Sequence, residues 1–195
     1  MRRLCAALAA ASMISACGTT KPLENVPLTW KPTSTAEFGA VNLSGIANTR
    51  IQFESFRDTR QNPQLVAENR EEAQPKPVTT RDDVGAFVSQ HLREVFNQAG
   101  LLTVDQGGDV VLSGEVRQFF VEETSTYNGS VVLYLKLRNR SGKTLWEGTA
   151  AGSAKRFGRS YSLENYDEVF SDSVTNAATT LLQDGEFRHA LAGST

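Results

Sequence analysis

The chain has 195 residues, of which 39% are hydrophobic and 22% charged, a balance typical of a water-soluble domain with a packed core. Its formal net charge of −2 and its lack of a lysine and arginine cluster argue against nucleic acid as a partner, because phosphate backbones are bound by concentrated positive charge. Its two cysteines, Cys5 and Cys17, both lie near the N-terminus, so the rest of the chain is expected to fold without a disulfide.

The N-terminus has the layout of a cleavable export signal. It begins with the basic sequence MRR, continues with an apolar, alanine-rich stretch over residues 4–14, and reaches Cys17 through small residues. The apolar stretch is shorter than the roughly 20 residues that a membrane-spanning helix needs. We therefore interpret residues 1–16 as a signal peptide and not as a membrane-spanning anchor.

The motif Ile14-Ser15-Ala16-Cys17 resembles the lipobox of bacterial lipoprotein precursors. The resemblance implies that Cys17 receives a diacylglycerol, that the chain is cut before it, and that the new amino group is acylated. Several acyl chains anchor stably, since each buried methylene contributes roughly 0.8 kcal/mol and one chain holds only marginally. The alternative is an ordinary secretory signal that ends by chance in a cysteine. Gly18 stands where aspartate would direct retention, and by similarity to enterobacterial sorting this indicates the outer membrane, with the domain facing the periplasm.

We interpret residues 17–40 as the lipidated cysteine and a flexible tether. The segment has no hydrophobic period, and it contains three prolines, Pro22, Pro27 and Pro32. Such a segment can reach several tens of ångströms from a membrane. Alternatively, Leu28, Trp30 and Phe38 attach it to the domain. Residues 41–192 are predicted to form a single periplasmic α/β domain.

The first half of this domain predicts a strand, a loop and a helix. Residues 46–56 alternate at period two towards their end and predict a strand. Residues 61–77 are polar and contain prolines, so we expect a mobile loop that faces solvent. A helix is predicted to begin at Thr79 or Thr80, with an aspartate three residues later as a capping box and a glycine after its end. Its predicted buried face comprises Val84, Phe87, Val88, Leu92, Val95, Phe96 and Ala99.

The second half predicts more strands and a second long helix. The expected strands cover residues 101–104, 109–123, 131–138 and 144–154. Asn128-Gly129 is a strong hairpin signal, and the small residues at the end of the last strand fit the close approach of another backbone or a sheet edge. A helix starting at Ser162 or Asn165 is predicted to bury Tyr166, Val169, Phe170, Val174, Ala177, Leu181 and Leu182, with one further turn after an interruption at Asp184-Gly185.

These elements predict an α+β fold, in which an antiparallel or mixed sheet of about four to five strands carries two long helices on one face as a two-layer sandwich. The other face of the sheet carries Glu115, Arg117, Lys136 and Arg138. We expect this charged face to be wet or to contact a partner.

A basic and aromatic connection over residues 156–161 is a weak candidate for a binding site. Arg156 and Arg159 can pair with lipid phosphate or an acidic partner, and Tyr161 is of a type that prefers interfaces. The alternative, which we favour, is a loop whose aromatic side chains cap the core.

No pattern in the sequence predicts catalysis. The two histidines, His91 and His189, each lie in a predicted helical stretch, so a nucleophile has no identifiable base. Glu122 and Glu123 are adjacent and would point apart in regular structure. We expect His91 to be structural, because no second metal ligand accompanies it. The sequence therefore indicates no catalytic residue, no metal site and no cofactor.

The order of elements resembles the YajG-like family of bacterial lipoproteins over roughly residues 43–191. The resemblance depends on the lipobox and on three short motifs, namely Arg57-Asp58-Thr59-Arg60, Ala99-Gly100-Leu101 and Asp109-Val110-Val111-Leu112-Ser113-Gly114. Auxiliary lipoproteins of lipid-transport ABC systems and the lipoprotein plug of the lipopolysaccharide translocon are similar in layout. The resemblance implies an α/β sandwich with two helices on one sheet face, outer-membrane anchoring, and no catalytic residues to carry over.

The expected function is that of a membrane-anchored lipoprotein that acts by binding, as an accessory or scaffold in an envelope assembly or lipid-transport complex, with an envelope protein as partner. One alternative is an envelope hydrolase or glycan-acting enzyme whose site is assembled from non-local residues. Another is a lipoprotein that binds peptidoglycan or lipid. Converging carboxylates in a pocket would favour the enzyme, and an exposed sheet edge or an apolar groove would favour the binder.

Overall fold

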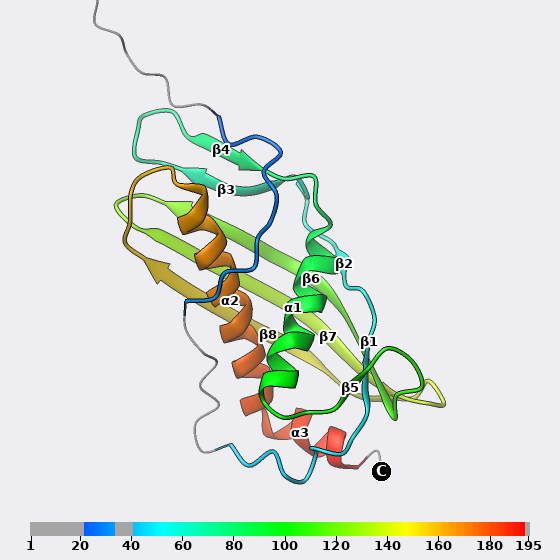
Figure 1. Ribbon diagram of the computed structural model, residues 1–195. Coiled ribbons are helices and arrows are strands. Elements are labelled where there is room, and N and C mark those ends of the chain that lie inside the picture. Colours follow the sequence, from blue (N-terminus) through cyan, green and yellow to red (C-terminus); the bar gives the residue numbers. More distant parts are fainter. Residues whose placement is uncertain (1–21, 34–40, 194–195) are drawn as a thin grey trace, which may run out of the picture.

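Three long antiparallel strands form the framework of the molecule, β6 (Val110–Glu123), β7 (Tyr127–Asn139) and β8 (Thr144–Arg156). The structure, a computed structural model, describes residues 22–33 and 41–193 (Figure 1). Alternate residues of β7 point to one face of the sheet and are fully or almost fully buried, namely Val131, Leu133, Leu135 and Leu137. The predicted half-buried strand is therefore confirmed.

Three short strands pair in parallel with β6 along its edge opposite β7. They are β1 (Ile51–Phe53), β2 (Arg57–Asp58) and β3 (Leu65–Asn69). They follow one another along the chain and along β6. Two further strands extend the sheet, because β4 (Lys76–Thr79) pairs antiparallel with β3 and β5 (Thr103–Val104) pairs in parallel with β1. The described residues thus form an eight-stranded mixed sheet, where the sequence predicted about four to five strands.

A buried arginine fills the break between β2 and β3. The side chain of Arg60 is 7% exposed and forms an ion pair of 2.7 Å with Asp58. Its guanidinium also donates to the backbone oxygens of Pro63 at 2.6 Å, Leu65 at 2.9 Å and Phe119 at 3.0 Å. These acceptors satisfy the donors of a charge that would otherwise be costly to bury. The chain can therefore leave the sheet after β2 and return to it at β3.

The prediction of a mobile loop over residues 61–77 is wrong, because β3 and β4 form a hairpin there. Val66, Ala67 and Val78 have no exposed surface. The two strands are only five and four residues long, so each buries too few apolar side chains to stand out among the surrounding prolines and charges. Pro77 is accommodated within β4, close to the border of the sheet, where a missing N–H group is tolerated.

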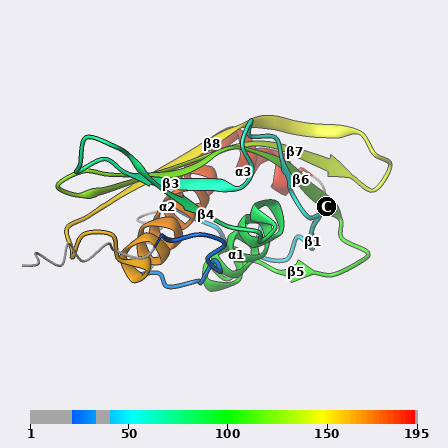
Figure 2. The same cartoon turned by 90° about the horizontal axis from the view of Figure 1, so that it is seen from above.

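Two long helices, α1 (Val84–Gln98) and α2 (Leu163–Gln183), cover one face of the sheet, as predicted, and a short α3 (Gly185–Ala192) follows. Figure 2 shows α1 and α2 on the same side of β6, β7 and β8. The predicted face of α2 is buried along its whole length. The further turn expected after residue 185 is a third helix of eight residues, for which the Asp184 side chain accepts from two backbone N–H groups.

The start of α1 and the turn of the β6–β7 hairpin both lie at other residues than predicted. The N-cap of α1 is Asp83, whose carboxylate accepts from the N–H of Ala86 at 2.9 Å, and the predicted start at Thr79 or Thr80 is wrong because Thr79 belongs to β4. Asn128-Gly129 lies inside β7, and the hairpin turn is formed by residues 124–126. Gly129 serves packing instead, because a Cβ atom there would lie 2.4 Å from a methyl group of Val169 on α2.

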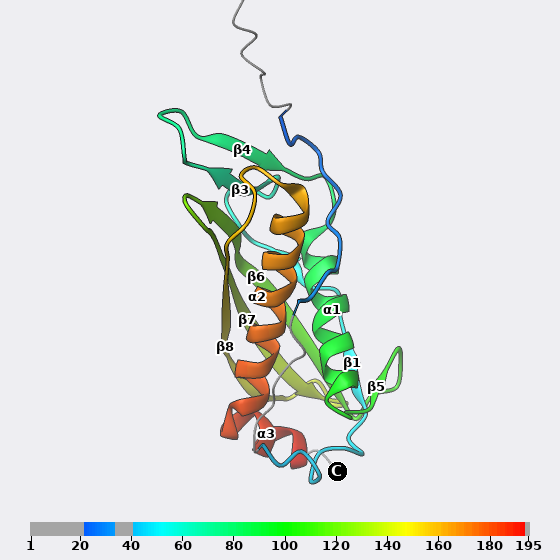
Figure 3. The same ribbon diagram turned by 60° about the vertical axis from the view of Figure 1, so that its left-hand side comes forward.

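Residues 22–33 lie across the outer side of α1 and α2 (Figures 1 and 3). Leu23 bridges to β4, while Leu28 and Trp30 pack against the core. The flexible tether is therefore wrong for this part of the segment, and attachment through Leu28 and Trp30 is correct. The reason is that the ring of Trp30 packs against Phe87 and His91 of α1. The backbone N–H groups of Thr29 and Lys31 also donate to side chains of α2. Phe38 lies outside the described residues.

Candidate functional site

Tyr161 connects three segments that are far apart in the sequence. Its phenol donates to the backbone oxygen of Pro77 at 3.1 Å and accepts from the backbone N–H of Leu23 at 3.0 Å. Its own backbone N–H donates to the carboxylate of Glu123 at 2.8 Å. These bonds hold Tyr161 at a φ of 51°, which is unusual for a residue with a side chain. We call this region, which comprises Pro22, Leu23, Pro77 and residues 155–161, the Tyr161 end.

A buried carboxylate supports the Tyr161 end from inside. Glu123 is 1% exposed and accepts from the phenol of Tyr166 as well as from the backbone of Tyr161. Tyr127 packs edge-on against Tyr166, with ring centroids 4.9 Å apart. Burial raises the pKa of both Tyr166 and Tyr127, and Glu123 contributes to both shifts in the same direction. The two phenols therefore stay protonated and act as donors in this network.

The three weak candidates from the sequence lie in one loop but have different surroundings. Arg156 forms an ion pair of 2.5 Å with Glu168 of α2, and its Nε donates to Asn165 at 3.2 Å. Tyr161 is bonded as described above. Arg159 offers its backbone oxygen to Asn165 and Tyr127, while the residue itself is exposed and forms no ion pair within the part of the chain that the structure describes. Arg156 and Tyr161 are thus structural, and Arg159 is free to meet solvent.

Phe157 belongs to the same basic and aromatic connection of residues 156–161, and its position differs from that of Tyr161. It is 82% exposed, so the expectation that the aromatic residues of the loop cap the core is correct for Tyr161 and wrong for Phe157. The next residue, Gly158, lets the loop pass close to α2, because a Cβ atom there would lie 2.4 Å from the side chain of Asn165. The hydroxyl of Tyr161 bonds to the backbone of Pro77 and Leu23, and Phe157 has no such group.

The open face of the sheet carries the four charged residues that the sequence placed there. Lys136 pairs with Glu147 at 3.2 Å, and the guanidinium of Arg117 lies 4.2 Å from the ring centroid of Tyr134. A shallow pocket of about 280 Å³ lies among them, lined by Glu54, Ser55, Arg57, Ser113, Gly114, Glu115, Tyr134 and Lys136. Its two carboxylates are each paired with a guanidinium, Glu54 with Arg138 and Glu115 with Arg57.

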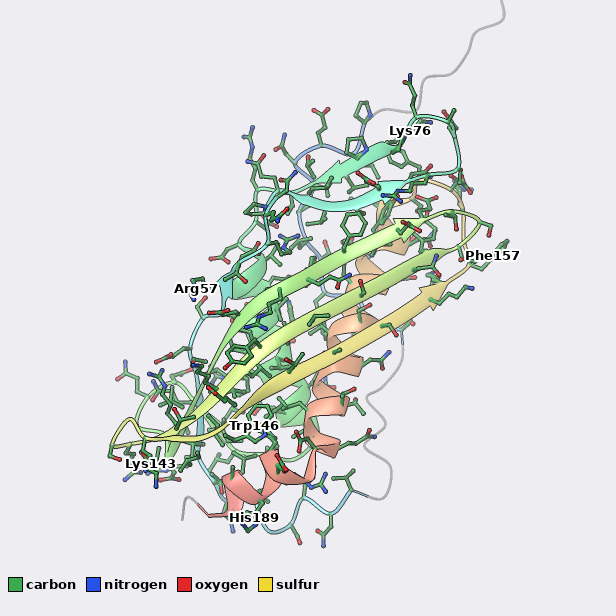
Figure 4. All side chains as sticks on the ribbon, turned by 180° about the vertical axis from the view of Figure 1, so that it is seen from behind. Arg57, Lys76, Lys143, Trp146, Phe157 and His189 are labelled. Atoms are coloured by element: carbon green, nitrogen blue, oxygen red, sulfur yellow. The ribbon has the colours of Figure 1, made fainter. Side chains whose placement is uncertain are left out.

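β8 forms a border of the sheet, because among the described strands it pairs with β7 alone (Figure 4). The backbone oxygen of Ser153 accepts from the side chain of Asn176 at 2.7 Å, so it points away from β7. By the alternation of an antiparallel strand, the backbone groups of Ala151 and Thr149 point the same way. Residues 148–154 contain neither charge nor proline, the usual protection of a free edge. Because Asn176 already occupies the oxygen of Ser153, the part of this edge that is open to a further strand is at Thr149 and Ala151.

Asp167 of α2 is hydrogen-bonded to the N-terminal segment, and its pKa lies within the pH range of ordinary stability measurements. It is 4% exposed, and its carboxylate accepts from the backbone N–H of Thr29 at 3.2 Å. Burial raises the pKa of Asp167 to about 6, although the bond from Thr29 and the charge of Lys31 act in the opposite direction. The carboxyl is therefore protonated in the folded state at a pH where it is ionised in the unfolded chain.

Asp167→Asn is expected to be more stable than the parent protein at pH 7 and equally stable near pH 4. Between the ordinary value of 3.8 and the folded value of about 6, the folded parent binds more protons, so its stability falls as pH rises. Asparagine keeps an oxygen acceptor for Thr29 without the buried charge. Urea unfolding at several pH values should show a difference that grows to the order of 3 kcal/mol above pH 6. A difference that does not change with pH would contradict this explanation.

Neither a metal-binding cluster nor a membrane-spanning helix is found in the described ranges 22–33 and 41–193. No group of three or more histidine, cysteine, aspartate or glutamate side chains there is placed to hold a metal ion. His91, the histidine considered above, stacks on Trp30 with ring centroids 4.2 Å apart and contacts Glu94 at 3.0 Å. No helix in these ranges is both long and apolar enough to cross a bilayer.

Comparison with known proteins finds similarity in structure alone. No family model and no characterised protein matches the sequence. A Xanthomonas campestris protein of family DUF330 is similar at a TM-score of 0.51 and 14% identity, over 69% of this chain and 81% of that one. PelC from Paraburkholderia phytofirmans, solved as a dodecamer, has a TM-score of 0.42 and 17% identity over 69% and 87%. A candidate lipoprotein from Caulobacter crescentus has a TM-score of 0.45 and 13% identity over 77% and 95%. The first likeness shows a shared fold.

Proposed function

We propose that this protein is a bacterial envelope lipoprotein, held at a membrane by lipid on Cys17, whose domain acts by binding and not by catalysis. Its proposed role is that of an accessory or scaffold in an envelope assembly or lipid-transport complex, with another envelope protein as partner. We propose the outer membrane as its site, with the domain in the periplasm. The lipobox, Gly18 and the YajG-like order of elements support this location.

The free edge of β8 is the observation that carries the binding role. An exposed edge offers unpaired backbone groups that an extended segment of a partner can join as a new strand. Thr149, Ala151 and Ser153 alternate along this edge with small, uncharged side chains. A partner strand could therefore approach without displacing a charge. The charged open face beside the edge would then supply side-chain selectivity.

The rival role, an envelope hydrolase, needs carboxylates that converge in an enclosed site. The carboxylates of the shallow pocket are paired with Arg57 and Arg138, as described above. The buried Glu123 accepts from Tyr161 and Tyr166, so its oxygens serve the fold. These pairings favour a binding protein over an acid–base catalyst.

Photo-crosslinking in intact cells tests the proposal. The full-length chain carries p-benzoylphenylalanine in place of Ala151 on the β8 edge, and a matched variant carries it in place of Ser141 in the exposed turn before β8. We expect a defined envelope protein to crosslink from position 151 and not from position 141. Cys17→Ser should release the protein from the membrane fraction, because the acyl chains provide the anchoring energy.

Two results would overturn this function in different ways. Unchanged membrane fractionation and maturation of Cys17→Ser would show that the lipid anchor is wrong. Absence of a crosslinked partner, together with turnover of a glycan substrate by the purified protein, would show that the domain is an enzyme.

A further inference from the structure

An exposed aromatic residue stands between two cations at the Tyr161 end. Phe157 is 82% exposed, whereas the other exposed large apolar residue of the described chain, Leu102, is 45% exposed. Lys155 and Arg159 flank Phe157 two residues away on either side, and both are exposed. Neither cation forms an ion pair within the described residues. An apolar tip flanked by cations matches the boundary between lipid headgroups and acyl chains.

The carboxylates that contact this loop come from other segments of the chain. Glu168 is paired with Arg156 at 2.5 Å, and Glu71 accepts from the hydroxyl of Ser160. Glu123 is buried and bonded to Tyr161. Residues 155–161 themselves contain no acidic residue, so the loop presents Lys155 and Arg159 outward, and these cations are complementary to anionic phospholipid.

The short chain between Cys17 and the domain limits where the lipid can lie. Pro22 is the fifth residue after Cys17, so their Cα atoms are at most about 18 Å apart in any conformation. Leu23, the next residue, bonds to the phenol of Tyr161 at 3.0 Å. Phe157 precedes Tyr161 by four residues, which limits their separation to about 14 Å. Phe157 and the lipid-bearing residue therefore belong to the same end of the domain.

The opposite end of the domain lies much farther from Phe157. β8 runs from Thr144 to Arg156, and its length is roughly 40 Å at the usual rise of a strand. Lys143, in the turn before β8, lies at one end of the open face, and Phe157 lies at the other end together with Lys76 of β4 (Figure 4). With a lipid on Cys17, Lys143 reaches the same bilayer surface only if the domain lies on its side, whereas Phe157 reaches it with the domain upright.

We infer that the Tyr161 end rests on the bilayer, with Phe157 inserted at the headgroup boundary and Lys155 and Arg159 on the lipid phosphates. This inference rests on the proposed acylation of Cys17 and adds an orientation to it. The long axis of β6, β7 and β8 then points away from the membrane. The β8 edge is thereby presented across the periplasmic space and not against the lipid.

Depth-dependent quenching tests the inference on the mature, acylated protein. Acylation occupies Cys17, so Phe157→Cys and the matched Lys143→Cys each provide a single thiol for bimane labelling. Both positions are exposed, and neither substitution removes a core side chain. The labelled proteins are reconstituted into vesicles of phosphatidylethanolamine and phosphatidylglycerol, with and without nitroxide-labelled phospholipid.

We expect nitroxide lipid to reduce bimane emission at position 157 by about twofold or more, because the loop would lie within the 5–10 Å that interfacial side chains penetrate. Emission at position 143 should not change. Equal quenching at both positions, or none at 157 in protein whose acylation is established by mass spectrometry, would overturn the inference alone. A blue shift at 157 without quenching would indicate a protein contact and would also overturn it. Absence of acylation would overturn the proposed function as well.

Discussion

Val174→Asp is expected to leave the protein largely unfolded. Val174 has no exposed surface and lies on the face of α2 that packs on the sheet. An aspartate there has no partner for its charge, and the cost of burying a polar group without a hydrogen bond is roughly 2–7 kcal/mol, and more for a charge. Typical domains have only about 5–15 kcal/mol of stability in total. Val88→Asp on α1 should behave in the same way, because Val88 is equally buried.

Circular dichroism and urea unfolding measure this effect. Thr180→Asp is a matched control, because Thr180 lies on the exposed side of the same helix and its substitution should change stability by about 0.5 kcal/mol or less. A well-folded Val88→Asp or Val174→Asp variant would contradict the packing of the two helices on the sheet.

Gly152→Ala is expected to destabilise the protein by about 3 kcal/mol, although it adds a single methyl group. A Cβ atom at Gly152 would lie 2.2 Å from the backbone nitrogen of Ala177 and 2.2 Å from the backbone oxygen of Ser173. Both atoms belong to α2, so no side chain can rotate away to relieve the clash. The helix has to move off β8, and the contacts of its buried face are lost with it.

Gly45→Ala is the matched control for this prediction. A Cβ atom at Gly45 would have no neighbour within 4 Å, so its melting temperature should stay close to that of the parent protein. Calorimetry of the two variants distinguishes steric crowding from a general effect of losing a glycine. Equal melting temperatures would contradict the close approach of α2 to β8.

The long elements could be predicted from the sequence because each repeats its pattern several times. α2 shows an apolar period over 21 residues, and β7 alternates over most of its 13 residues. The predicted small-residue approach is also correct, since Gly152 lies against α2. Long periodic segments average out the local exceptions that mislead shorter ones.

The short strands could not be predicted, because their pairing is not local. β1, β2 and β3 have between two and five residues, and each depends on β6, which follows about 50 to 60 residues later in the chain. Arg60 looks like part of a solvent-exposed motif in the sequence, yet its side chain is 7% exposed. The carboxylate of Asp58 and the surrounding backbone carbonyls explain this burial.

The sequence predicts which loop contains the candidate site, but it does not predict which side chains of the loop are exposed. Residues 156–161 stand out as basic and aromatic, and the structure brings all three named candidates together there. Arg156 and Tyr161 are bonded within the domain through partners such as Glu168 and Pro77. Nothing in the sequence connects these partners to the loop. The exposure of Phe157 follows from those partners as well, because they fix the path of the loop.

The central position of β6 determines the order in which the molecule can fold. β1, β2 and β3 are made first by the ribosome, but their pairing partners appear only when residues 110–123 are synthesised. By contrast, β6, β7, β8 and α2 are consecutive and make contacts of short sequence separation, which form fastest. We therefore expect the C-terminal half to collapse first and the N-terminal strands to dock last. The nascent chain would accordingly remain unstructured until more than half of it exists, as the proposed export through a translocation channel would require.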